Sequence, residues 1–130
     1  MGKSSLRMEQ KEMSSALTVS EARGWADYLT QRNFRGPGDT VEAAMNRAAR
    51  KSGVPFKTFW SLRYNRARRL WADTYLALRN AYENEVLRQE AKLRDELNQF
   101  EKVMGPAAAS DPYFRAAKAA LEAIEKEREG

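Results

Sequence analysis

The side chains best able to bind another molecule are arginines and lysines gathered in the middle third of the chain. Positions 39–82 hold nine basic and three acidic residues, whereas the whole 130-residue chain holds 23 basic and 18 acidic residues. Guanidinium and ammonium groups bind phosphates and carboxylates, so this local excess of positive charge predicts a polyanionic partner. The residues selected on this ground are Arg47, Arg50, Lys51, Arg63, Arg66, Arg68 and Arg69.

Catalytic chemistry is poorly supported by the residue types present. The chain has no Cys and no His, which excludes disulfides, thiolate zinc sites, Cys nucleophiles and every His-dependent mechanism. Carboxylates are frequent over 83–104, but they have basic neighbours at helical spacing, as in the pair Glu90 and Arg94. The Gly-Pro-Gly segment at 36–38 follows a predicted helix rather than a strand, so it does not indicate a phosphate-binding loop. We therefore expect no enzymatic activity, no catalytic residue, no cofactor and no metal ion.

The spacing of apolar residues predicts helices and no strand, because no alternation of period two is sustained along the chain. A capping box that starts at Thr18 predicts a first helix over about 19–34. A second helix ends near Ser52, next to Gly53, which tolerates a left-handed backbone. Pro55 suits the first turn of a third helix. The fold class predicted from these signals is all-α.

The longest helical pattern covers 67–104 and begins its apolar stripe at Trp71. Its steps of mostly four and three residues are typical of a coiled coil. Three short helices are too small to cover so long a stripe, so we expect the distal half to bind another copy of the chain. The residues predicted for this oligomerisation contact are Val86, Leu93, Leu97, Phe100 and Met104. Gly105 and Pro106 end this helix, and a short flexible link over 107–110 then leads to Asp111, which caps a final amphipathic helix. That helix either folds back on the long one or binds a protein partner through 113–128.

The chain therefore divides into four predicted segments. These are a flexible tail over 1–17, a three-helix unit over 18–66, a long oligomerisation helix over 67–104, and a linker with a C-terminal helix over 105–130. No apolar run approaches the roughly 18 to 20 residues that span a bilayer, and the N-terminal stretch lacks the apolar core of a signal peptide. We expect a soluble, cytoplasmic protein with no membrane partner.

The second and third predicted helices have the spacing of a helix-turn-helix, in which two helices cross steeply at a tight turn. The crossing needs a small residue where the helices touch, here Ala49, and a residue that accepts a positive φ four positions later, here Gly53. It also needs apolar residues at the turn exit and on the inner side of the second helix. These are Val54, Phe59 and Leu62.

Together with Ala48, these positions resemble the helix-turn-helix family of bacterial and phage repressors, over about 20 of the 130 residues. Two residues depart from the family pattern. Ser52 stands where the family usually has an apolar residue, and Pro55 replaces the usual Ser or Thr cap of the second helix.

This resemblance implies that the third helix enters the major groove of double-stranded DNA and presents its outward side chains to the bases. The implied base contacts are Lys57, Trp60, Ser61, Tyr64 and Phe56. The seven basic residues selected above become the implied phosphate contacts. For Phe56 and Trp60, packing against a neighbouring helix is the alternative.

The sequence thus predicts sequence-specific binding of double-stranded DNA by a transcriptional regulator that acts as a homodimer or higher oligomer, associated with the bacterial nucleoid. One helix-turn-helix reads few base pairs, so two copies must be held about 34 Å apart. Two alternatives remain open. One is a DNA-packaging component that resembles a small terminase subunit, and the other is a protein-binding adaptor without affinity for DNA.

Overall fold

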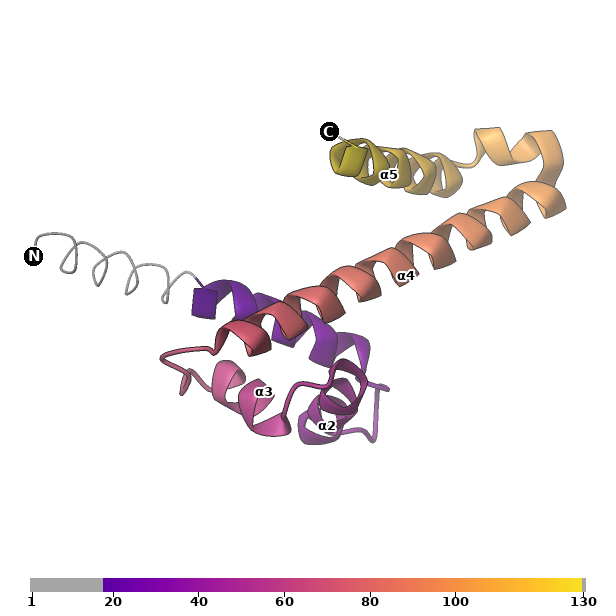
Figure 1. The fold of residues 1–130 in the computed structure, drawn as a ribbon. Helices are drawn as coiled ribbons and strands as arrows, with labels where there is room; N and C mark the ends of the chain where they lie inside the picture. The colour runs from indigo at the N-terminus through magenta and orange to yellow at the C-terminus, as the bar shows by residue number, and fades with distance from the viewer. Residues whose placement is uncertain (1–17, 130) are drawn as a thin grey trace, which may run out of the picture. The chain divides into compact units, whose positions relative to one another are not determined.

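The computed structural model describes residues 18–129, and within that range the chain is helical with no strand. The all-α prediction is confirmed over this range, whereas the tail predicted over 1–17 lies outside the described residues. Figure 1 shows the order of the elements. They are a helix over 18–32, α2 Val41–Ser52, α3 Phe56–Arg63, α4 Ala72–Met104, the 3₁₀ helix η1 Gly105–Ser110, and α5 Pro112–Glu129.

The chain forms two compact units that divide within α4, after Asn84. The first unit contains the 18–32 helix, α2, α3 and the first turns of α4, and the second contains the rest of α4, η1 and α5. The helix-turn-helix predicted from the sequence therefore lies entirely in the first unit.

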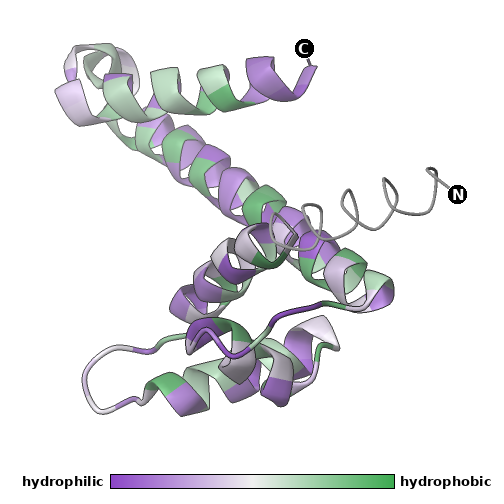
Figure 2. Cartoon of the chain, turned by 90° about the vertical axis from the view of Figure 1, so that its left-hand side faces the viewer, coloured by the Kyte–Doolittle hydropathy of each residue, from purple (hydrophilic) through white to green (hydrophobic). Residues whose placement is uncertain are grey.

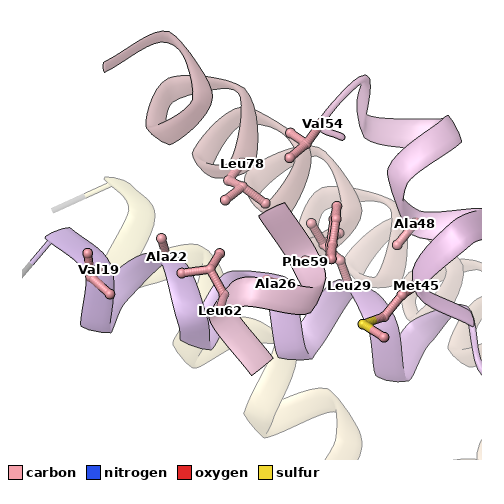
Figure 3. Close-up of a cluster of buried hydrophobic side chains, with 10 residues drawn as sticks. All are labelled: Val19, Ala22, Ala26, Leu29, Met45, Ala48, Val54, Phe59, Leu62 and Leu78. Carbon is pink, nitrogen blue, oxygen red and sulfur yellow. The ribbon is translucent and has the colours of Figure 1, made fainter. Parts of the chain in front are cut away.

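The first unit is held together by one apolar core (Figure 3). The 18–32 helix contributes residues spaced three and four apart, which places them on one side of the helix. The buried core residues are Val19, Ala22, Ala26, Leu29, Met45, Ala48, Val54, Phe59, Leu62 and Leu78.

Aromatic rings attach the start of α4 to this core. The Trp25 ring lies 5.1 Å from that of Tyr75 and 6.1 Å from that of Tyr82, between ring centroids. Tyr28 meets Tyr82 edge-on at 5.0 Å. The long helix is therefore fixed at its beginning by the helix that precedes the helix-turn-helix.

The second unit is a pair of helices, the distal part of α4 and α5, joined by η1. Leu97, Phe114 and Leu121 are buried with Ala108 of η1, and the ring of Phe100 stacks on that of Phe114 at 5.5 Å. Two ion pairs also join the helices, Arg94 with Glu125 and Arg128 with Glu90. Along α5, hydrophobic and hydrophilic residues alternate (Figure 2), as packing on one side requires.

This packing changes the interpretation of the predicted oligomerisation face. Leu97 is buried against α5 of the same chain, and Leu93 and Phe100 are partly buried against the same cluster. The alternative in which the C-terminal helix folds back on the long one is the arrangement found here. Of the other two predicted residues, Val86 is half-buried and Met104 is exposed.

Two boundaries differ from the prediction. The link predicted as flexible over 107–110 belongs to the 3₁₀ helix Gly105–Ser110, in which Ala108 is buried. The long helix begins at Ala72, not near 67, because the chain turns sharply after α3. Asn65 has a φ of 58°, and the backbone N–H groups of residues 66 and 67 both donate to the Ser61 carbonyl, at 2.7 and 3.2 Å.

Candidate nucleic-acid interface

The turn between α2 and α3 has the backbone that the sequence predicted for it. Gly53 ends α2 with φ 76° and ψ 7°, and its N–H donates to the Ala49 carbonyl at 3.0 Å. This left-handed cap satisfies a carbonyl at the helix end and turns the chain toward Val54, which is buried.

The two residues that depart from the repressor pattern both stabilise this turn. The Ser52 hydroxyl donates to the Ala49 carbonyl at 3.4 Å and accepts the Val54 N–H at 3.2 Å. The Pro55 carbonyl accepts the Thr58 N–H at 3.0 Å and so closes the first turn of α3. The Ser52 hydroxyl thus bridges the turn, and the fixed φ of Pro55 sets the start of α3 without a side-chain cap.

Substitution of the turn glycine provides a direct test of this geometry. We expect Gly53→Ala to lower the free energy of unfolding by about 1 to 2 kcal/mol, since a Cβ disfavours the left-handed backbone even though no neighbour blocks it. The matched control is Gly24→Ala, which lies within the 18–32 helix without a positive φ and with open space around it. That change should raise the free energy of unfolding by about 0.5 to 1 kcal/mol. Urea unfolding of both variants measures the difference, and equal effects would contradict the turn described here.

Packing on one side of α3 determines which of its residues are presented outward. Phe59 and Leu62 are buried, and Phe56 packs partly buried against the same core. The Arg23 guanidinium also donates to the Leu62 carbonyl at 3.0 Å, which satisfies a backbone group at the C-terminal end of α3. The sequence analysis did not identify this positioning role of Arg23, because only the tertiary fold brings the two residues together.

The opposite side of α3 is open. Lys57 is exposed, Trp60 is 37% exposed and Tyr64 is 48% exposed, whereas Ser61 is half-buried. The rings of Trp60 and Tyr64 contact each other, with centroids 5.2 Å apart. The sequence analysis left open whether Phe56 and Trp60 contact bases or pack against a neighbouring helix. Phe56 packs against the core, and Trp60 faces outward.

The predicted phosphate contacts fall into two groups. Arg47 is engaged inside the unit, where its guanidinium donates to the Asn33 carbonyl at 3.0 and 2.9 Å and forms an ion pair with Asp39. The Arg35 backbone N–H, which donates to the Asp39 carboxylate at 2.8 Å, and the Arg47 guanidinium together lower the pKa of Asp39. Arg63 lies 3.9 Å from an Asp27 carboxylate oxygen. The remaining five are exposed, namely Arg50, Lys51, Arg66, Arg68 and Arg69.

A basic groove lies beside α3, between that helix and the irregular segment 66–71. Its volume is about 360 Å³, and no carboxylate lines it. None of its four basic side chains forms an ion pair with a residue in the described part of the chain. The residues that line the basic groove are Lys57, Thr58, Ser61, Arg66, Ala67, Arg68, Arg69, Leu70, Trp71 and Thr74.

Trp71 is the residue of this region that the sequence analysis placed wrongly. It was assigned to the apolar stripe of the long helix, but it precedes α4 and is 82% exposed. The signal that could have identified it is an indole two residues after the pair Arg68 and Arg69, since basic residues interleaved with aromatic ones are typical of nucleic-acid-binding surfaces.

Comparisons with known proteins give no family for this chain. No protein-family model, curated protein or solved structure matches it. Within the described residues, no group of acidic side chains could hold a metal ion, and no helix has the length and apolarity to cross a membrane.

Proposed function

We propose that this protein binds double-stranded DNA in a sequence-specific manner and regulates transcription, with α3 as the helix that enters the major groove. The observation that carries the proposal is the asymmetry of α3. Its inner side is buried through Phe59 and Leu62, while Lys57, Trp60 and Tyr64 are exposed among basic residues. A short helix that is anchored on one side and flanked by cations suits the dimensions and charge of the major groove.

The proposed roles follow from the exposed atoms. The Lys57 ammonium reaches guanine O6 and N7, the Ser61 hydroxyl donates to or accepts from a base edge, and the Trp60 ring contacts a thymine methyl. Arg50 and Lys51, exposed in the last turn of α2, bind phosphates at the edge of the groove. Arg47 has no part in this interface, because Asn33 and Asp39 engage its guanidinium.

Self-association belongs to the same proposal, since two half-sites need two copies of the chain. Leu97 is buried against α5, and Leu93 and Phe100 are partly buried there, so exposed residues of α4 are added to the proposed contact. Met104 and its neighbour Val103, which is 83% exposed, are the candidates at the end of α4. Sedimentation measures the assembly: a dimer favours a regulator, whereas a ring of eight or more copies favours a packaging component.

Selection of bound fragments from random DNA at moderate salt tests the proposal as a whole. Enrichment of one motif supports sequence-specific binding, and a symmetric motif supports two half-sites. Binding without enrichment of a motif would overturn specificity. Absence of any salt-dependent affinity would overturn DNA binding and favour the protein-binding adaptor.

Replacement of Lys57 by glutamine tests the proposed base contact. We expect the affinity for the selected motif to fall by about 5- to 150-fold, with little change for unrelated DNA, because a lost base contact costs about 1 to 3 kcal/mol at one position only. The control is Lys102→Gln, an exposed lysine of the second unit. Titrations of both variants against matched and unrelated duplexes measure the difference. An equal loss for all sequences would reassign Lys57 to a phosphate.

A further inference from the structure

We propose that the basic groove beside α3 is a second DNA-binding site, which holds the sugar–phosphate backbone of the strand next to the bases that α3 reads. In this arrangement the Trp71 indole lies against the adjoining nucleotide. The inference rests on the proposed function and adds to it the part of the ligand that the groove holds, a site that extends from α3 to the segment 66–71, and a nucleotide contact by Trp71.

The charge of the basic groove identifies an anion as its ligand. Four cationic side chains, Lys57, Arg66, Arg68 and Arg69, line about 360 Å³ of space without any carboxylate. Asp73, the acidic residue next along the chain, is directed to the Thr74 N–H at 3.0 Å and is not part of the lining. Like charges gathered around one groove repel each other, and an anion that enters removes this repulsion while releasing its own counterions.

The neutral residues of the basic groove indicate a phosphodiester rather than a carboxylate-bearing chain. The Thr58, Ser61 and Thr74 hydroxyls line it together with the cations. Hydroxyl groups and guanidinium groups are the usual side-chain donors to phosphate oxygens in protein–DNA complexes. The apolar residues Leu70 and Trp71 supply a surface that a deoxyribose ring can cover.

The exposure of Trp71 is the second, independent observation. An indole that is 82% exposed leaves most of a large apolar surface in water, which a folded chain normally avoids. Trp71 is the last residue of the irregular segment that carries the arginines, and its side chain lines the same groove as theirs. Aromatic rings beside cations bind nucleotides by stacking on a base or sugar while the cations hold the phosphate.

The basic groove is continuous with the proposed major-groove surface. Lys57 and Ser61 belong to α3 and also line the groove. A strand whose bases meet these two residues therefore passes directly to Arg66, Arg68 and Arg69. The turn at Asn65, which ends α3, places the segment 66–71 beside that helix.

Fluorine NMR of protein labelled with fluorotryptophan separates the two sites, because the chain has three tryptophans in three environments. Trp25 packs against Tyr75 and Tyr82 in the core, Trp60 lies on α3, and Trp71 lies at the basic groove. Assignment uses Trp60→Phe and Trp71→Phe. The probe is a short mixed-sequence DNA duplex at low salt, where non-specific binding suffices. We expect the Trp60 and Trp71 signals to shift with added duplex and the Trp25 signal to remain in place.

The other possible outcomes show which of the two proposals is wrong. A shift of Trp60 without a shift of Trp71 would overturn the groove site and leave the function of α3 supported. A shift of Trp71 without a shift of Trp60 would overturn the role of α3 and leave the groove site supported. If neither signal shifts, both proposals are overturned.

Charge-matched variants then measure the contribution of the basic groove. Arg66→Gln, Arg68→Gln and Arg69→Gln together should reduce the slope of log affinity against log salt by roughly three, since each lost phosphate contact reduces it by about one. The control removes the same charge from exposed residues of the second unit, with Lys102→Gln, Arg115→Gln and Lys126→Gln. Equal slopes for the two triple variants would overturn the groove site in favour of a general effect of net charge.

The indole is tested by Trp71→Ala and rescued by Trp71→Phe. We expect the alanine variant to bind the duplex about 5- to 100-fold more weakly, and the phenylalanine variant to recover most of the loss, because stacking needs an aromatic face. Equal affinity of the alanine variant and the unchanged protein would remove Trp71 from the interface. Circular dichroism of each variant verifies that the helices are unchanged.

Discussion

Replacement of Phe59 by alanine is expected to lower the free energy of unfolding of the first unit by about 3 to 5 kcal/mol. The Phe59 ring is 1% exposed and lies in the core with residues of the 18–32 helix and α2. Alanine would leave a cavity of most of a ring, and few of its neighbours can move to fill it. Urea or thermal unfolding followed by circular dichroism measures the loss.

DNA binding should decline in parallel, because α3 depends on this residue for its position. A helix of eight residues is far below the roughly 12 to 15 residues at which an isolated helix becomes marginally stable in water. Its orientation therefore comes from Phe59, Leu62 and the hydrogen bond from Arg23. The test is a DNA-affinity titration of Phe59→Ala at a temperature below the midpoint of its thermal unfolding. It shows whether packing of the buried side of α3 is needed for the exposed side to bind DNA.

The matched control is Trp60→Ala, one residue further along the same helix. It removes a larger aromatic side chain, but that side chain is 37% exposed and its recorded ring contact is with Tyr64. We expect its cost in stability to stay below about 1.5 kcal/mol and its cost in DNA affinity to be the larger effect. If both variants lost the same stability, the division of α3 into an anchored and an exposed side would be wrong.

The parts of the fold that the sequence predicted correctly are those with a local cause. Gly53 adopts the left-handed conformation that was predicted for the end of α2. Pro55 precedes α3, and the Asp111 carboxylate accepts the Phe114 N–H at 2.9 Å to cap α5. Each of these signals acts within four residues, so no knowledge of the tertiary fold is needed to interpret it. The capping box at Thr18 is the exception, since residue 18 is already helical.

The parts that the sequence predicted wrongly or missed depend on partners distant in the chain. Nothing near Arg47 in sequence indicates that the Asn33 carbonyl would engage it. Apolar residues in the irregular segment 66–71 have the same spacing as those of the helix that follows, so Trp71 was included in the stripe of the long helix although α4 begins at Ala72. Periodicity identifies which side of a helix is apolar, but the identity of the helix that covers this side depends on the tertiary fold.

Replacement of Leu97 by aspartate is the second change with a large expected effect, and it tests which chain covers the distal part of α4. Leu97 is 8% exposed and packs with Phe114 and Leu121 of α5. A carboxylate there would be buried without a partner. We therefore expect the free energy that holds α5 against α4 to fall by at least about 3 kcal/mol. Hydrogen exchange measured by mass spectrometry should show loss of protection throughout α5 and unchanged protection in α2 and α3.

Val103→Asp is the control, because Val103 is on the same helix and 83% exposed. It should leave the protection of α5 unchanged, and if Val103 and Met104 join two copies, it should lower the mass of the assembly. Leu97→Asp should have the opposite pattern, with α5 detached and the assembly retained. An assembly that dissociates in Leu97→Asp while α5 stays protected would mean that Leu97 contacts another copy of the chain. The original prediction of a seam through Leu93, Leu97 and Phe100 would then replace the packing within one chain.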